Sequence, residues 1–486
     1  MQAMSSEWVR TLRRRGAPTA LLASLALLLA AGPAAARPAA ARPAAARSAP
    51  ARRSAPSFPS GDGLQVSSVE RLDDRLYEIT VTTSALPGPA AIRILLPAAY
   101  EAEPKRRYPV LYLFHGTSGG ASDWTLKGEA ERTTEGLPLI VVMPDIALDD
   151  DGGGYCTNWV SGAYGWETFH IGELIPWVDT NLRTIAARAG RAVAGLSQGG
   201  FCSLSYAARH PDLFQTALAY SGVPDIAYND TDTAGFTAIA YATEVGLDGE
   251  PPNSMFGSRL TDEINWADHD PTTLAGNLRG MNLFEYFGNG QPAPEETPEP
   301  AAMSIEALVH EDNIHFHERL AELDIPSLYD PYGDGTHSWP YWTRDLEWSI
   351  GPVMEDFAHP APAPEKVTYT VADPQYSVFG WNVEMHRTAE EFSTLEEADA
   401  QGFALVGSGS ATVLTPADYR RGRSYLVTMR GHEGTSSETV QASPAGRLLL
   451  QVPLGPPNPY QQDTPEAIAA GSIVYTTLVT VSRAPR

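Results

Sequence analysis

The sequence predicts an α/β domain with a mostly parallel sheet, followed by an all-β domain. Strand-like apolar runs alternate with helical patterns from about residue 65 to residue 360, a Pro/Ala stretch interrupts the chain at 359–364, and only short strand-like runs follow. Strands that alternate with helices pair in parallel and are covered by helices on both faces of the sheet. The 486 residues are enough for two domains.

In the first domain we expect strands at 76–82, 91–96, 108–114, 137–143, 192–195, 214–220, 283–287 and 327–329. The runs 108–114 and 137–143 are almost wholly apolar, which indicates burial on both faces. Residues 166–182 show helical spacing of apolar side chains. Residues 225–281 lack the alternation of strand-like and helical patterns. We therefore expect them to form an inserted cap over a site at the carboxyl ends of the strands. The alternative is an excursion without a role in binding.

The second domain, residues 366–486, is expected to be a β sandwich without a metal or redox motif. Its predicted strands are 367–371, 378–383, 403–406, 411–414, 424–429, 438–441, 447–452 and 473–481, with a helical piece near 389–400. The predicted division of the chain is a signal peptide (1–36), a disordered Ala/Pro/Arg linker (37–60), the α/β domain (61–358), a second linker (359–365) and the β domain. Separate cores would let residues 60–362 fold alone.

The N-terminus has the pattern of an export signal. Arg10 and the run 13–15 precede an apolar stretch at 20–31, and Ala34 and Ala36 form an A-x-A cleavage motif. The apolar stretch is too short to span a bilayer of roughly 30 Å. We therefore expect a secreted, extracellular or cell-wall-associated protein whose mature form does not span the membrane. An uncleaved anchor is the alternative.

Charge and cysteine content exclude several classes of partner. The formal net charge is −25, and residues 1–53 contribute +8 from nine Arg and one Glu, which leaves −33 on the remainder. A strongly acidic protein repels nucleic acid and anionic membranes. The two cysteines are too few for a disulfide scaffold. A Cys156–Cys202 bond is one alternative, but we expect Cys202 to face the core as a small hydrophobic side chain.

The pentapeptide Gly195-Leu196-Ser197-Gln198-Gly199 is the most informative motif. It follows the apolar run 192–194 and precedes a predicted helix at 198–210. A G-x-S-x-G sequence between a strand and a helix is typical of a nucleophile elbow, where the serine hydroxyl stands clear of the sheet. Ser197 is therefore the predicted nucleophile, and a plain tight turn is the alternative.

A serine hydroxyl needs a base and hydrogen-bond donors for the oxyanion. His337 lies in a Gly-containing loop after the last predicted strand and is our candidate base; the histidines of the helix 310–317 are expected on a solvated face rather than in a metal site. The backbone N–H groups of Gln198 and Thr117 are the candidate oxyanion donors. For the acid, spacing leaves five carboxylates open: Asp225, Glu295, Glu296, Glu306 and Asp330.

These motifs resemble those of the esterase D-like α/β-hydrolases, in particular the secreted trehalose mycolyltransferases, over roughly residues 65–357. The matching segments are Gly195-Leu196-Ser197, Trp166-Glu167-Thr168-Phe169, Gly288-Asn289-Gly290 and Gly335-Thr336-His337-Ser338-Trp339. The resemblance implies an α/β-hydrolase fold without a cofactor. It also implies Glu306 as the acid, because Val309, Asn313 and Phe316 follow it in the family pattern.

Two departures from that family bear on the substrate. Where the transferases hold trehalose with an Asp and an Arg, this chain has His115 and Ser118, and their disulfide ahead of the Trp-Glu-Thr-Phe helix is not reproduced. We expect His115, Trp124 and Trp339 to contact the substrate. The alternative for the tryptophans, which include Trp342, is core packing.

The function we predict is hydrolysis of carboxylic esters through an acyl-serine intermediate. The alternative is transfer of the acyl group to a sugar or lipid alcohol. A catalytically silent wall-binding protein and a peptidase are less favoured, the former because a complete Ser, His and Glu set is present. The expected substrate is a small or envelope ester, and the β domain is the candidate for carbohydrate or cell-wall contact.

Overall fold

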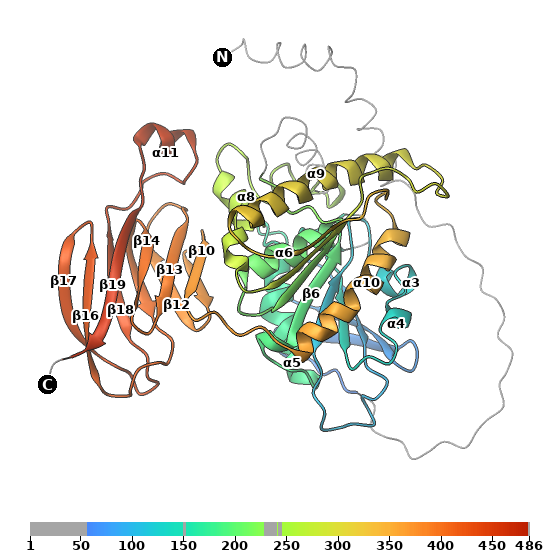
Figure 1. Cartoon of the computed structure of the whole chain (residues 1–486), viewed down its shortest axis with the longest axis horizontal. Coiled ribbons are helices and arrows are strands. Elements are labelled where there is room, and N and C mark those ends of the chain that lie inside the picture. The colour runs from blue at the N-terminus through green and yellow to red at the C-terminus, as the bar shows by residue number, and fades with distance from the viewer. Residues whose placement is uncertain (1–55, 149–151, 228–240, 242–244, 485–486) are drawn as a thin grey trace, which may run out of the picture.

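The computed structural model describes residues 56–148, 152–227, 241 and 245–484 of the chain. These residues form an α/β domain and a C-terminal β domain that lie side by side (Figure 1). The predicted signal peptide and most of the predicted linker lie outside the described residues. Within the described part of the chain, none of the helices has the length and apolar character needed to cross a membrane.

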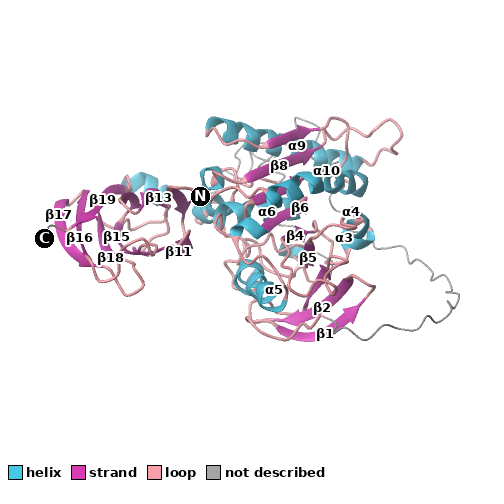
Figure 2. Ribbon diagram, turned by 60° about the horizontal axis from the view of Figure 1, so that its bottom comes forward, coloured by secondary structure: helices cyan, strands magenta, loops and turns pink. Residues whose placement is uncertain are grey.

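A nine-stranded sheet forms the centre of the first domain, in the order β1-β2-β3-β5-β4-β6-β7-β8-β9 (Figure 2). The strands β4 to β9 are parallel, and β1, β2 and β3 add an antiparallel edge. Their bounds are β1 Gln65–Arg71, β2 Leu76–Thr82, β3 Ala90–Leu95, β4 Val110–Phe114, β5 Ile140–Pro144, β6 Arg191–Leu196, β7 Thr216–Tyr220, β8 Asn282–Phe287 and β9 Leu328–Pro331. The predicted α/β-hydrolase sheet is confirmed.

Helices cover both faces of this sheet. One face carries α5 (Ile175–Asn181), α6 (Gln198–Arg209) and α9 (Pro300–Glu322), and the other carries α3 (Asp123–Leu126), α4 (Ala130–Thr133) and α10 (Trp339–Ala358). The central strand β4 contributes side chains to the apolar cores on both faces. Val110, Tyr112 and Phe114 lie in one core, and Leu111 and Leu113 lie in the other. Successive strand residues point to opposite faces, so a strand between two helical layers must be apolar throughout.

Three details of this domain differ from the sequence prediction. The edge strand β1 was not predicted, because its side chains are mostly exposed and show no apolar alternation. The predicted helix 166–182 is split into a π-helical segment, η1 (Thr168–Leu174), and α5, and the change falls next to Pro176, which has no N–H to donate. Residues 56–60 do not behave as linker, since Phe58 is buried and stacks on Trp177.

The β domain is a sandwich of two antiparallel sheets with its own apolar core, as predicted. The six-stranded sheet has the order β10-β13-β14-β19-β16-β17, and the four-stranded sheet has the order β11-β12-β15-β18. The bounds are β10 Val367–Val371, β11 Gln375–Val378, β12 Trp381–His386, β13 Ser393–Asp399, β14 Gly402–Gly407, β15 Gly409–Leu414, β16 Ser424–Gly431, β17 Gly434–Gln441, β18 Leu449–Gly455 and β19 Tyr475–Arg483; a short helix α11, Pro465–Ala470, precedes β19.

Two predictions for the β domain were wrong. The predicted helical piece at 389–400 contains the strand β13, in which Ser393 and Leu395 are buried and their neighbours are more exposed. The predicted strand 378–383 is a hairpin between β11 and β12 that turns at Phe379 and Gly380, where both residues have positive φ.

The insertion 225–281 is described only in part. Its last portion forms α8 (Glu263–His269) and the short 3-10 helix η3 (Ala275–Leu278). The helix η3 packs between α6 and β10, and the carbonyl of His269 at the end of α8 accepts a hydrogen bond from Ser205 of α6. Asn277 donates to the carbonyl of Ala208 and exchanges two hydrogen bonds with the backbone of Thr370. This portion therefore connects the two domains, and a cap over the site stays a prediction.

Candidate active site

Ser197 lies at a sharp turn between β6 and α6. Its backbone has φ 53° and ψ −121°, a positive-φ conformation outside the left-handed helical region that residues with a Cβ avoid. Both flanking glycines are required by close backbone contacts: a Cβ on Gly195 would lie 2.2 Å from the carbonyl oxygen of Gly199, and a Cβ on Gly199 would lie 2.3 Å from that of His115. The turn therefore holds the serine at the carboxyl edge of the sheet.

His337 lies in the loop between β9 and α10, and its ring reaches Ser197. The Nε2 atom is 2.8 Å from Oγ of Ser197, at hydrogen-bond distance. The backbone N–H of His337 donates to the carbonyl of Ala302 on α9, and the imidazole packs edge-on against Trp342. The loop is thus fixed from two sides, with the ring directed at the serine.

Glu306 holds the other nitrogen of this imidazole. It projects from α9, is fully buried, and its Oε2 lies 2.7 Å from Nδ1 of His337. Its Oε1 accepts hydrogen bonds from the hydroxyl of Ser221 (2.8 Å) and from the N–H of Gly288 (2.7 Å). A carboxylate that accepts at Nδ1 favours the tautomer of the neutral ring in which Nε2, the nitrogen facing Ser197, is the acceptor.

Glu296, another of the carboxylates that spacing left open, has a different place in the structure. Glu296 accepts hydrogen bonds from the hydroxyls of Thr336 and Tyr341, and so fastens the loop that carries His337. Burial would raise the pKa of Glu296, but these hydrogen bonds lower it below its ordinary value. Among the described residues, Glu306 is the carboxylate that bonds His337.

Ser221 is a site residue that the sequence analysis missed. It follows β7 directly, has a φ of 46° and is fully buried. Its position gave a usable signal, because residues that directly follow parallel strands gather at the edge of the sheet where the site lies.

The two candidate oxyanion donors lie at this same edge. Phe114 at the end of β4 pairs with Gly195 at the end of β6, so the loop after β4 faces the serine turn. The side-chain amide of Gln198 donates to the hydroxyl of Thr117 at 3.3 Å. A Cβ on Gly116 would lie 2.6 Å from the side chain of Leu196, so a glycine allows this close approach.

Two of the three predicted substrate contacts need correction. His115 is only 1% exposed; its Nδ1 donates to the carbonyl of Gly116, and its Nε2 accepts from the N–H of Ile146. Trp124 is also 1% exposed and donates to the carbonyl of Phe114. Both side chains support the loop after β4 from inside the protein. Trp339 is partly exposed and packs edge-on against Trp124. Its contact with the substrate stays a prediction.

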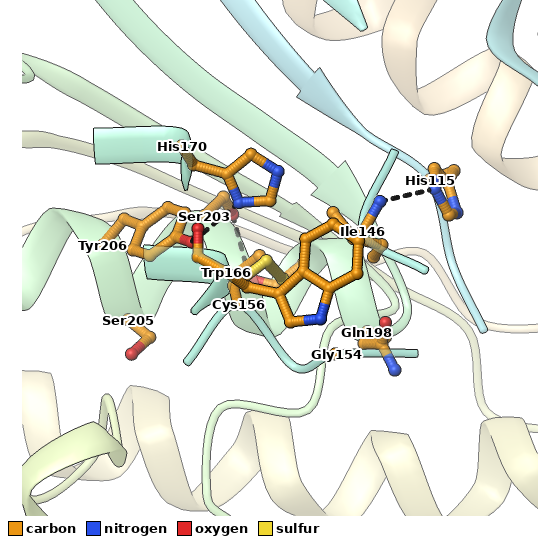
Figure 3. Close-up of a disulfide and its surroundings, with 12 residues drawn as sticks. His115, Ile146, Gly154, Cys156, Trp166, His170, Gln198, Ser203, Ser205 and Tyr206 are labelled. Carbon is orange, nitrogen blue, oxygen red and sulfur yellow. Dashed lines mark hydrogen bonds between the residues drawn. A yellow bond between two sulfur atoms is a disulfide. The ribbon is translucent and has the colours of Figure 1, made fainter. Parts of the chain in front are cut away.

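Cys202 faces the core as predicted, but the expectation that it is unpaired was wrong. Cys156 and Cys202 form a disulfide with a Cα–Cα distance of 5.4 Å (Figure 3). They are 46 residues apart in the sequence, and only the folding of the segment after β5 onto α6 brings them together.

The helix histidines are not arranged as a metal site. In the described ranges, no group of three or more His, Cys, Asp or Glu side chains could hold a metal ion. The helix face is also less solvated than expected: His310 donates to the carbonyl of Gly288, and His317 stacks on Tyr329.

The sheet, the serine turn and the hydrogen-bonded Ser, His and Glu side chains define a protein of the α/β-hydrolase class. The family model described as "Putative esterase" matches residues 83–349, and the chain belongs to this esterase family. Esterase Rv1288 of Mycobacterium tuberculosis is 34% identical over 275 residues, which is 55% of this chain and 56% of that protein. The chain thus spans little more than half the length of that relative.

A second group of relatives consists of acyltransferases. Diacylglycerol acyltransferase/mycolyltransferase Ag85B of Mycobacterium leprae is 30% identical over 252 residues, which cover 49% of this chain and 73% of that protein. Among solved structures, Mycobacterium tuberculosis MPT51 (FbpC1) aligns with 60% of this chain and 98% of its own, with a TM-score of 0.48 and 23% identity.

Proposed function

We propose that the chain is an exported serine esterase that hydrolyses carboxylic esters through an acyl-serine intermediate. The observation that carries the proposal is the continuous line of hydrogen bonds from Glu306 through His337 to Ser197, with distances of 2.7 and 2.8 Å. A serine hydroxyl becomes a nucleophile when a neighbouring imidazole can take its proton and a carboxylate orients that imidazole.

The geometry supports the following sequence of steps. Oγ of Ser197 attacks the ester carbonyl while its proton passes to Nε2 of His337, and the oxyanion accepts hydrogen bonds from the N–H groups of Gln198 and Thr117. Glu306 stabilises the imidazolium that forms. The leaving alcohol takes the proton from Nε2, and an acyl-serine remains. Water then repeats the attack, with His337 as the base, and releases the carboxylic acid.

Export is proposed from two independent features. The first is the basic and then apolar N-terminus with its A-x-A motif. The second is the Cys156–Cys202 disulfide, since such bonds persist in oxidising compartments and are rare in the cytosol. Both support a secreted or cell-wall-associated protein.

Acyl transfer to a sugar or lipid alcohol is the second candidate, favoured by the 30% identity to mycolyltransferases. A transferase must hold its acceptor against competing water, which takes fixed polar contacts. Of the two positions where those transferases are expected to hold trehalose, His115 is buried with both ring nitrogens bonded to the chain. The other, Ser118, cannot replace the fork of donors of an arginine. We therefore favour hydrolysis.

One experiment tests the proposal and separates the two candidates. The mature protein is treated with a fluorophosphonate probe and assayed on p-nitrophenyl esters from acetate to palmitate, with and without trehalose. We expect labelling at Ser197, free acid as the main product, and a loss of turnover on the order of 10⁴ to 10⁶ in Ser197→Ala. Acyl-trehalose as the main product would establish the transferase instead. Turnover that survives in Ser197→Ala would refute both.

A further inference from the structure

The Cys156–Cys202 disulfide joins the nucleophile helix to a segment that covers the oxyanion side of the site. Cys202 lies on α6 four residues after Gln198, so both side chains occupy the same face of the helix. Cys156 belongs to residues 152–157, which we name the cover segment. Figure 3 shows the disulfide beside Trp166, with Gly154 and Gln198 close to each other. Both cysteines are buried.

The cover segment contacts Gln198 and the loop that contains Thr117, the two residues whose N–H groups are the candidate oxyanion donors. Gly153 packs on the side-chain amide of Gln198 so closely that a Cβ on this glycine would lie 1.9 Å from Nε2. The same amide donates to the hydroxyl of Thr117. The N–H of Ser118, the residue after Thr117, donates to the carbonyl of Gly152 at 3.1 Å. A displacement of the cover segment would therefore reach Gln198 and the loop of Thr117 together.

The conformation of the cover segment needs support from its surroundings. Tyr155 and Cys156 have φ angles of 45° and 50°, a left-handed backbone that is unfavourable for residues with a Cβ. Such a conformation persists only where neighbouring structure holds it. Gly154 is held by its N–H, which donates to the carbonyl of Ile146, and by its carbonyl, which accepts from the indole of Trp159. At Cys156 the bond to Cys202 supplies a covalent link to α6.

We propose that this disulfide is a positioning element for the oxyanion hole. It holds the cover segment against Gln198 and Thr117, and so keeps their two N–H groups directed at the point where the oxyanion forms. Donors of this kind act by being fixed before the reaction, and misplacement of one costs turnover rather than substrate binding. The proposal depends on the proposed esterase function for its effect on kcat, but not for its effect on the backbone.

The kinetic test compares the wild-type protein with the double variant Cys156→Ala/Cys202→Ala at a temperature well below the unfolding of both. We expect kcat on p-nitrophenyl acetate to fall about 10-fold while KM changes less than twofold, since removal of a whole oxyanion donor typically costs on the order of 10² to 10³. The affinity for a boronic acid, which forms a tetrahedral adduct with the serine, is expected to fall by the same factor. A folded double variant with wild-type kcat would overturn the proposal.

Two matched variants separate positioning from general stability. Asp179→Asn breaks a buried ion pair with Arg191, which starts β6 at the edge of the sheet opposite Ser197. It is expected to lower the unfolding temperature and leave kcat unchanged. Gly153→Ala keeps the disulfide but introduces a Cβ against Gln198. It is expected to lower kcat with little change in KM, and it serves as the test if the double variant does not fold. A wild-type kcat in Gly153→Ala would also overturn the proposal.

Hydrogen exchange gives a readout that does not depend on activity. In the double variant, we expect faster exchange of backbone amides at 115–120, 152–158 and the first turn of α6, and unchanged exchange in α9. Unchanged exchange at 115–120 would refute the positioning role even in an active enzyme. If the wild-type protein shows no ester turnover but exchanges more slowly than the double variant at these amides, the esterase function is refuted and the positioning role stands.

Discussion

At the scale of single residues, Glu306 is the carboxylate on which the proposed mechanism depends. It is fully buried, and three hydrogen bonds fix its two oxygens. Replacing it by an amide of the same shape removes the negative charge that stabilises the imidazolium. With the amide oxygen still accepting from Ser221 and Gly288, the N–H₂ group faces Nδ1 of His337 and favours the tautomer that cannot take the serine proton. The expected cost therefore falls on turnover.

We predict that Glu306→Gln lowers kcat by about 10³ to 10⁴ on p-nitrophenyl acetate, while KM and the unfolding temperature change little. Asp330→Asn, a carboxylate that spacing also left open, is the matched control and should keep near-normal turnover. If Asp330→Asn were the inactive variant, Glu306 would not be the acid.

His170 provides a pH-dependent test of stability next to the disulfide. Its Nε2 donates to the carbonyl of Asp145, and its Nδ1 accepts from the hydroxyl of Tyr206. Burial lowers the pKa of His170 to about 3, against an ordinary value near 6.5. The unfolded chain therefore binds a proton more readily than the folded protein between these two values. Stability contributed by neutral His170 is present above pH 6.5 and is lost as the pH falls towards 3.

We predict that the free energy of unfolding of the wild-type protein depends more steeply on pH than that of His170→Gln between pH 4 and 6.5. One proton corresponds to a slope difference of up to ~1.4 kcal/mol per pH unit. Urea unfolding at several pH values measures this difference. A pH-independent loss of stability caused by the substitution itself would shift the whole curve of His170→Gln without changing its slope. Equal slopes would mean that His170 does not remain neutral in the folded protein.

At the scale of elements, the contact between β6 and α6 decides whether the serine turn can form. A Cβ on Gly195 would overlap the backbone of Gly199, so an alanine must push the strand and the helix apart. We predict that Gly195→Ala lowers the free energy of unfolding by about 1 to 3 kcal/mol, the usual cost of overpacking, and lowers ester turnover strongly.

The matched control for this prediction is Gly351→Ala on α10, where a Cβ would meet nothing within 4 Å. Alanine favours a helix by up to about 1 kcal/mol over glycine, so this variant should be as stable as the wild-type protein or more stable, with unchanged turnover. Normal activity of Gly195→Ala would show that the turn tolerates a displaced helix.

Elements also show where a sequence pattern is insufficient. The segment around β13 is rich in Glu and Ala, which favour helices, yet it forms a strand between β10 and β14. Its fit between two partner strands outweighs its local preference, because strand preference depends on packing against neighbours. The edge strand β1 was missed for the opposite reason: with both faces largely exposed, it carries no apolar alternation.

At the scale of the whole molecule, Arg209 joins the two domains. It ends α6, is 5% exposed, and pairs with Glu167, with Asp268 and, in the β domain, with Asp373. Burial alone would raise the pKa of Glu167, but Arg209 and the bond from His210 hold it well below its ordinary value. Tyr369 of β10 donates to the carbonyl of Arg209, and the N–H of Ala372 donates to Asp268. The two domains have separate apolar cores, but the charged groups of their interface form ion pairs and hydrogen bonds across it.

We predict that residues 56–362 fold and keep ester turnover at low temperature but unfold at a clearly lower temperature than the full chain. Removing the β domain takes three partners from Arg209 and Asp268, and buried charges that lose partners are costly. Calorimetry on both proteins measures the difference, and Asp373→Ala in the full chain, which removes one ion pair, should give a smaller shift in the same direction. Equal unfolding temperatures would show that the domains are independent.

The sequence by itself determined the features that depend on local pattern. Apolar periodicity determined most strands of both domains, and the glycines around Ser197 determined a strand, turn and helix there, because both signals lie within a few consecutive residues. The position of His337 after the last strand followed from the order of the elements.

Only the tertiary structure decided which distant side chains meet. It brought Glu306, which the family resemblance had implied and spacing alone had not, to His337, paired Cys156 with Cys202, placed His115 and Trp124 inside the protein, and built the Arg209 interface. Each of these depends on the order of strands in the sheet and on how helices pack across it. That arrangement brings together residues 31 to 164 positions apart in the chain, as in the bonds of His337 with Glu306 and of Arg209 with Asp373, and no local pattern encodes such a separation.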